Sequence, residues 1–152
     1  MSKLKPLTEL KKITSKLKKD GKTIVFTNGC FDILHPGHIK ILEVAKNKGD
    51  ILIVGLNSDS SVKKIKGSKR PILNETARIK ILEQISIIDY IILFAETTPY
   101  RIIRAIKPDI LVKGEDWAKN KIIGQELVRK VCRVKMYRGY STTKIIERIK
   151  NV

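Results

Sequence analysis

The sequence is poor in cysteine, histidine and aromatic residues: its 152 residues include two cysteines, two histidines and one tryptophan. Cys30 and Cys132 fit neither a CxxC motif nor a metal-ligand spacing, which argues against a disulfide framework. No apolar run approaches the roughly 20 residues of a membrane span, and the N-terminus does not resemble a signal peptide. We therefore expect a cytoplasmic protein that does not enter a membrane.

Negative charge is also scarce, since 32 Lys and Arg residues face 15 Asp and Glu residues and give a net charge of +17. This charge raises the hypothesis of a basic nucleic-acid-binding module, which gains affinity by releasing counterions. However, the aromatic content of 5% provides no stacking platform for single strands, and the lysines are spread along the chain. We expect no specific nucleic-acid partner, but a positive field that attracts small phosphorylated molecules.

Short apolar runs alternate with amphipathic segments along the chain. The runs predict strands over residues 23–26, 51–56, 90–93, 109–113 and 131–137. Helices are predicted over residues 4–18, 38–47, 74–85, 99–106 and 144–149, with a polar loop over 57–73. This order predicts one α/β domain over residues 1–152, a Rossmann-like parallel sheet with helices on both faces. An amphipathic helix within residues 1–20 packs at its edge.

Both histidines lie where the first predicted strand passes into a helix. They are three residues apart in His35-Pro36-Gly37-His38, and Pro36 suits the first turn of a helix because that turn tolerates a missing N–H. Helix N-termini and the crevice beyond the strand ends of α/β sheets both attract phosphates. The pattern therefore predicts a nucleotide-phosphate site.

A metal site and a buried core histidine are the alternatives for this pair. A metal would need further ligands from Cys30, Cys132 or scattered carboxylates, and no spacing supports them, so we predict no protein-built metal site. Three roles stay open for Asp32: it could orient a lysine, hold a metal ion or cap the turn.

Gly29-Cys30-Phe31-Asp32 followed by His35-x-Gly37-His38 resembles the signature of the cytidylyltransferase-like nucleotidyltransferases, whose HxGH histidines contact the triphosphate. Two later segments resemble the family's base-pocket stretch and its second motif, namely Asp109 to Trp117 and Ser141-Thr142-Thr143. Three more are similar to the adenylyltransferase domain that makes ADP-heptose: Asn57-Ser58-Asp59, Lys66-Gly67-x-x-Arg70-Pro71 and Phe94-x-Glu96-x-Thr98-Pro99. The resemblance covers about residues 20–150.

This resemblance implies an enzyme that transfers AMP from ATP to D-glycero-D-manno-heptose 1-phosphate, releases pyrophosphate and feeds lipopolysaccharide or glycan assembly. It implies Mg²⁺ carried mainly by the nucleotide phosphates. A glycerol-3-phosphate cytidylyltransferase and a small FAD synthetase are the alternative enzymes. The oligomeric state stays open, with a homodimer as one arrangement.

The resemblance also implies which residues act. The implied catalytic residues are His35, His38 and Lys66. The implied nucleotide-binding residues are Thr27, Asn28, Gly29, Cys30, Phe31, Asp32, Lys113, Gly114, Asp116, Trp117, Arg138, Ser141, Thr142 and Thr143. The implied sugar-phosphate-binding residues are Asn57, Asp59, Arg70 and Arg78. From local pattern alone, Ser141 is also typical of a helix N-cap and Arg78 of a surface charge.

Overall fold

The computed structural model describes residues 2–115 and 122–152, and these residues form an α/β domain around one parallel sheet. The sheet consists of β1 (Ile24–Gly29), β2 (Ile51–Asn57), β3 (Tyr90–Phe94), β4 (Ile110–Gly114) and β5 (Lys130–Val134). Every strand pair is parallel, and the strand order is β3-β2-β1-β4-β5. The chain order reverses between β1 and β4, which makes this the place where such sheets open a crevice beyond their strand ends.

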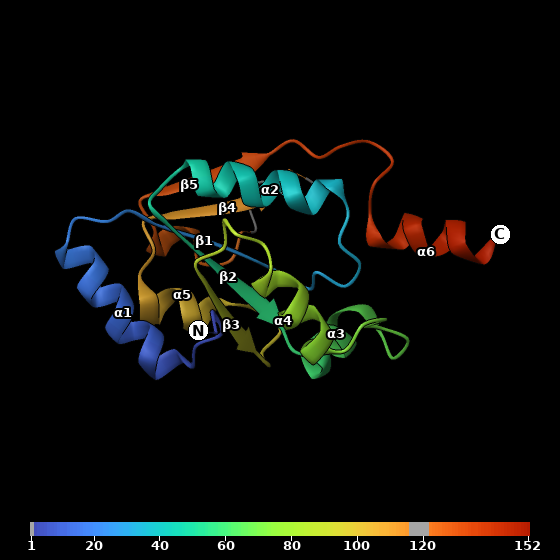
Figure 1. The fold of residues 1–152 in the computed structure, drawn as a ribbon, viewed down its shortest axis with the longest axis horizontal. Coiled ribbons are helices and arrows are strands. Elements are labelled where there is room, and N and C mark those ends of the chain that lie inside the picture. The colour runs from blue at the N-terminus through green and yellow to red at the C-terminus, as the bar shows by residue number, and fades with distance from the viewer. Residues whose placement is uncertain (1, 116–121) are drawn as a thin grey trace.

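Helices cover both faces of the sheet, as predicted (Figure 1). They are α1 (Leu7–Lys19), α2 (Pro36–Asn47), α3 (Asp59–Lys66), α4 (Glu75–Glu83), α5 (Tyr100–Ile106), the short 3-10 helix η1 (Gln125–Leu127) and α6 (Thr142–Lys150). The α2 and α4 helices pack on one face, and α1 and α5 pack on the other. None of the described helices is both long and apolar enough to cross a bilayer.

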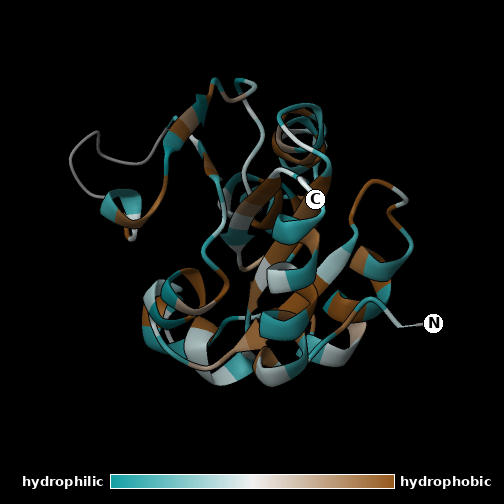
Figure 2. Ribbon diagram, turned by 90° about the vertical axis from the view of Figure 1, so that its left-hand side faces the viewer, coloured by the Kyte–Doolittle hydropathy of each residue, from teal (hydrophilic) through white to brown (hydrophobic). Residues whose placement is uncertain are grey.

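The central strands are mostly apolar (Figure 2), because both faces of the sheet are covered and most of their side chains are buried. Neighbouring residues of β1 show this directly. Val25 joins the core beneath α2, with Leu42 and Ala45, whereas Phe26 joins the opposite core, which contains Leu10 of α1. Successive side chains of a strand therefore pack in different cores. The same alternation determines the face of the sheet on which each later residue of β1 lies.

Several predicted boundaries are wrong, among them that of the strand expected over residues 131–137, which ends at Val134. Residues 27–29 were expected to turn, but they continue β1 and pair with residues 54–56 of β2. Residues 57–73 were expected to be a loop, yet they contain α3. Ser58 is the N-cap of this helix and accepts a hydrogen bond from the N–H of Ser61. The α2 helix begins at Pro36 rather than at His38, because His35 acts as its N-cap.

The two ends of the chain differ in how they attach to the sheet. The N–H of Lys5 donates to the carbonyl of Ile91, and the N–H of Ile91 donates to the carbonyl of Lys3, so the N-terminal segment lies along the outer edge of β3. In contrast, α6 extends away from the sheet at the other end of the molecule and has no buried residue (Figure 1).

Candidate active site

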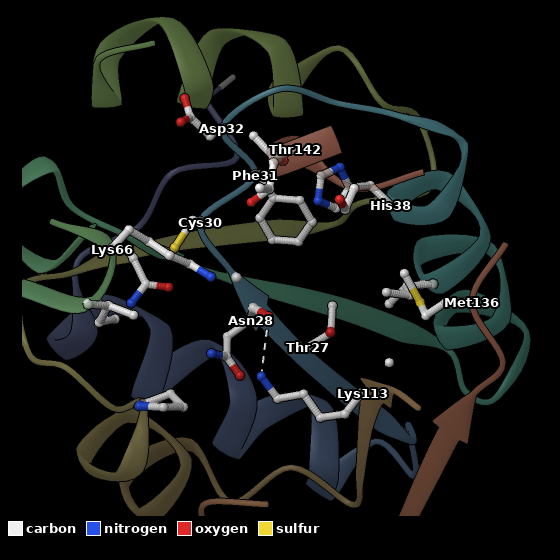
Figure 3. A pocket seen from close by; sticks show the side chains of 18 of the residues that line it. Thr27, Asn28, Cys30, Phe31, Asp32, His38, Lys66, Lys113, Met136 and Thr142 are labelled. Carbon is white, nitrogen blue, oxygen red and sulfur yellow. Dashed lines mark hydrogen bonds between the residues drawn. The ribbon is translucent and has the colours of Figure 1, made fainter. Parts of the chain in front are cut away.

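A cavity of about 460 Å³ opens at the carboxyl ends of β1 and β4, beside the point where the strand order reverses (Figure 3). Most of the sequence-predicted site residues line it: Thr27, Asn28, Gly29, Cys30, Phe31, Asp32, His35, His38, Asn57, Lys66, Arg70, Lys113, Gly114, Ser141, Thr142 and Thr143. The fold therefore brings together segments from both halves of the chain. A concave site with converging polar groups is the usual form of a small-molecule site.

The two histidines cap the helix that they begin. The Nδ1 atom of His35 accepts a hydrogen bond from the N–H of Gly37 at 3.1 Å, and the Nδ1 atom of His38 accepts one from the N–H of His35 at 3.3 Å. Their rings stack with centroids 3.8 Å apart. Gly37 is required between them, because a Cβ at this position would lie 2.9 Å from the His35 ring and 3.0 Å from Met136.

This capping fixes the tautomer of both rings. An Nδ1 atom that accepts a hydrogen bond carries no proton, so each neutral imidazole carries its proton on Nε2. The first-turn N–H groups of Gly37 and His38 already donate to His35. A phosphate was expected at this helix N-terminus, but these two N–H groups already have acceptors, so the two Nε2–H groups are the donors that remain.

Both histidines are neutral near pH 7. Burial lowers the pKa of His35, and burial together with the neighbouring His35 lowers the pKa of His38 from 6.5 to about 4. The site therefore presents two neutral hydrogen-bond donors rather than two fixed charges. Neutral donors suit a role in which hydrogen bonds strengthen as charge develops on a ligand.

The depressed pKa of His38 predicts a pH dependence of stability. The unfolded chain binds this proton near pH 6.5 and the folded chain only near pH 4, so the free energy of unfolding falls as the pH drops through that interval. Between about pH 7 and about pH 5, the melting temperature of the wild type should fall further than that of His38→Asn. Equal falls in the two proteins would contradict the assigned pKa.

Asp32 ties the end of β1 to the loop that follows α3. Its carboxylate accepts hydrogen bonds from the N–H groups of Ile72 and Leu73 and pairs with the Nε of Arg70 at 2.9 Å. Burial alone would raise the pKa of Asp32, but the donors at Leu73 and Ile72 and the Arg70 guanidinium together lower it below its ordinary value. These partners include neither a lysine nor a backbone group of its own turn, so the contacts point to a structural role outside the predicted ones: Asp32 holds Arg70 at the cavity.

Arg78 is completely buried and does not line the cavity. Its guanidinium donates to the carbonyls of Leu73, Cys30 and Asn57 at 2.7–2.9 Å and pairs with Asp59 at 2.7 Å. The Arg78 side chain thus bonds to Asp59 and to backbone carbonyls, and neither Arg78 nor Asp59 is placed to bind a sugar phosphate in the cavity. They hold the ends of β1 and β2, which form part of the cavity wall.

The N-terminus of α6 reaches the cavity from the other side. Ser141 caps this helix by accepting a hydrogen bond from the N–H of Lys144, as its sequence pattern predicted. Within the described part of the chain, the N–H groups of Thr142 and Thr143 have no acceptor, so they remain for a ligand. Arg138 is exposed and does not line the cavity, in contrast to its predicted role.

Several lining residues were not assigned a role from the sequence: Ile41, Ile65, Thr97, Thr98, Pro99, Ile122, Ile123, Met136 and Tyr140. Thr98 and Pro99 belong to a segment that carried the family resemblance, which is the one signal that could have identified them. The apolar residues have no chemical signature and reach the cavity only through the fold. Two predicted residues, Asp116 and Trp117, lie outside the described residues.

Cys30 is not an activated nucleophile. Burial raises the pKa of its thiol, and this effect outweighs the nearby positive charges of Lys66 and Arg78. The thiol therefore stays protonated near neutral pH, and a protonated thiol is a poor nucleophile. The chemistry of this cavity must then come from its hydrogen-bond donors and cations.

The position of the paired histidines, at the reversal point of a parallel sheet, defines the class of the protein as an α/β nucleotide-binding protein. The chain belongs to the cytidylyltransferase-like family, whose model matches residues 26–148. The resemblance seen in the sequence is thereby confirmed over most of its length.

Relatives from bacteria share about half of the residues of this chain. The bifunctional protein HldE of Helicobacter pylori strain J99 is 51% identical over 141 residues, which are 93% of this chain and 30% of that protein. The protein of the same name from Aliarcobacter butzleri strain RM4018 is 51% identical over 148 residues, or 97% of this chain and 31% of that protein. The chain thus spans less than a third of the length of these relatives.

Two solved structures share the fold. The lipopolysaccharide core biosynthesis protein from Thermoplasma volcanium GSS1 is 32% identical with a TM-score of 0.66, over 77% of this chain and 99% of that chain. The pantoate-beta-alanine ligase from Francisella tularensis is 17% identical with a TM-score of 0.71, over 100% of this chain and 74% of that chain. The second likeness concerns the fold alone.

Proposed function

We propose that the chain is a nucleotidyltransferase that transfers AMP from ATP to D-glycero-D-manno-heptose 1-phosphate and releases pyrophosphate. The observation that carries the proposal is the pair of neutral Nε2–H donors at the cavity, formed by the motif that defines the family resemblance. The relatives named bifunctional protein HldE and the lipopolysaccharide core biosynthesis protein support the heptose assignment.

The reaction is an in-line displacement at the α-phosphorus of ATP. An oxygen of the sugar phosphate forms the new P–O bond, and the bond between the α-phosphorus and the bridging oxygen breaks, so that pyrophosphate leaves with the electron pair. The attacking phosphate is already ionised at pH 7 and needs no general base. The protein must therefore hold two anions together and stabilise the charge that moves to the leaving group.

The cavity contains groups suited to each of these tasks. His35 and His38 donate hydrogen bonds to the phosphates of ATP from one side, and the N–H groups of Thr142 and Thr143 approach from the other. Lys66 and Arg70 add positive charge that offsets the repulsion between the two substrates. Arg70 is positioned by Asp32, which is itself almost fully buried.

The magnesium ion belongs to the substrate, MgATP, in this proposal. Asp32 is the one carboxylate among the described residues that line the cavity, and both of its oxygens already accept hydrogen bonds. No group of three or more His, Cys, Asp or Glu side chains forms a metal site among the described residues. The donor set thus fits an ion held mainly by phosphate oxygens.

The test is pyrophosphate release from each of ATP, CTP, GTP and UTP with either heptose 1-phosphate or glycerol 3-phosphate as the acceptor. ATP with heptose 1-phosphate should give a specificity constant at least ~10-fold above every other pair. A site that pairs with the hydroxyls of a sugar ring disfavours glycerol 3-phosphate, which carries fewer of them. A reaction without acceptor measures hydrolysis of the triphosphate.

Each rival function predicts a different outcome, either in this panel or in a parallel assay with FMN or with nucleic acid. Preference for CTP with glycerol 3-phosphate would identify a glycerol-3-phosphate cytidylyltransferase, and AMP transfer to FMN would identify an FAD synthetase. Tight binding of duplex or single-stranded nucleic acid at ~0.15 M salt, without pyrophosphate release, would support the basic binding module. Any of these results would overturn the heptose assignment.

A further inference from the structure

One buried polar side-chain atom in the wall of the cavity has no partner among the described residues. Among the described residues, the Oδ1 of Asn28 is the single buried side-chain nitrogen or oxygen atom without a hydrogen bond. Other buried polar side chains nearby, such as those of Asn57 and Arg78, are hydrogen-bonded. An unsatisfied buried amide costs free energy in the folded chain, so its presence in a cavity wall requires an explanation.

The amide of Asn28 has space on the cavity side. Asn28 follows the alternation of β1 and lies on the same face of the sheet as Phe26, the face covered by α5. On the neighbouring strand, a Cβ at Gly55 would lie 2.7 Å from the Phe26 ring and 3.2 Å from the Cβ of Asn28. Glycine at position 55 therefore avoids crowding of the side chain at position 28.

The side chain of Asn28 lies on a different side of the cavity from His38 (Figure 3). The Nζ of Lys113 donates to the backbone carbonyl of Asn28 at 3.3 Å, and the amide side chain lies beside Lys113 and away from His38 (Figure 3). Thr98 and Pro99, in the loop that leads into α5, also line the cavity. This loop belongs to the segment that resembles the heptose branch of the family.

We infer that the Asn28 amide binds a hydroxyl group of the acceptor sugar and thereby helps to select a polyhydroxylated acceptor. A hydroxyl group both donates and accepts hydrogen bonds, so it can satisfy a neutral amide in either orientation. A phosphate would leave the Oδ1 unsatisfied, because a phosphate dianion offers no donor. The inference rests on the proposed function, and it names the part of the acceptor that this residue recognises.

The test compares Asn28→Ala with the wild type in AMP transfer. The KM for heptose 1-phosphate should rise about 10-fold, because the sugar hydroxyl loses its partner, while the KM for ATP should stay within about 2-fold. Asn47→Ala is the matched control, since Asn47 is exposed at the end of α2 and outside the cavity. This control should change neither constant.

Thermal unfolding separates recognition from a structural role. An amide without a partner in the free protein contributes no hydrogen bond to its stability, so Asn28→Ala should melt at or above the temperature of the wild type. A fall of several degrees would overturn the inference. A raised KM for ATP, or a changed preference for ATP over 2′-deoxy-ATP, would assign the amide to the ribose and would also overturn it.

Calorimetric binding of heptose 1-phosphate in the absence of nucleotide distinguishes this inference from the proposed function. If the wild type binds the sugar phosphate about 10-fold more tightly than Asn28→Ala, the inference holds. If both proteins bind it equally, the inference fails while the proposed function stands. If the wild type neither binds nor adenylylates the sugar phosphate, both fail.

Discussion

Replacing His38 by asparagine is expected to lower the turnover number for AMP transfer roughly 10²–10³-fold, the usual effect of removing one oriented donor from a charged transition state. The Oδ1 of asparagine can still accept the hydrogen bond that Nδ1 of His38 receives from the N–H of His35. Helix capping is therefore kept, and only the Nε2–H donor is lost. Steady-state kinetics and thermal unfolding of the same preparation check the two effects separately.

His35→Asn should behave in the same way, because its Oδ1 can replace the Nδ1 that accepts from Gly37. His35→Ala provides the contrast: it removes the donor and the cap together, and should add a loss of about 1 kcal/mol in the free energy of unfolding. If either asparagine variant unfolded yet kept near-normal turnover per folded molecule, the histidines would be structural and the active site misplaced.

Arg78→Met is expected to lower the free energy of unfolding by about 3–5 kcal/mol, a large part of the stability of a small domain. The substitution leaves the carbonyls of Cys30 and Asn57 without a donor and Asp59 without its buried partner. Methionine fills a similar volume, so the loss reports the missing hydrogen bonds rather than an empty space. Denaturant unfolding followed by circular dichroism measures it.

Arg101→Met is the matched control. Arg101 pairs with Glu96 at 2.9 Å, but their side chains are 64% and 43% exposed, and exposed ion pairs contribute less than about 1 kcal/mol. A similar loss in the free energy of unfolding of both variants would show that the buried hydrogen bonds of Arg78 stabilise the fold no more than an exposed ion pair does.

The fold could be predicted because its strands are short apolar runs separated by helices, and such runs are buried on both faces of a parallel sheet. The errors lie where polar residues form regular structure. In α3, Val62 is the one buried apolar residue, and its lysines hide the helical pattern. Residues 27–29 contain Asn28 and Gly29, which favour turns, yet pairing with β2 keeps them in the strand.

The candidate site could be predicted where residues follow strands, because the ends of parallel strands meet at one edge of the sheet. The sequence could not show that Arg78 turns inward, since an arginine in a helix is usually exposed. It could have shown the capping role of the histidines, because three residues is also the spacing between an N-cap and the third helical position. That interpretation requires histidine to replace the usual serine or threonine.

The two edges of the sheet also affect whether copies of this chain can pair through their edge strands. An unpaired edge strand is a template for aggregation, and proteins cover such edges or place charge on them. The segment Lys3–Lys5 covers β3, whereas β5 at the opposite edge carries Lys130 and Arg133. Two β5 strands that approached each other would bring positive charges together, so strand addition between copies is disfavoured at either edge.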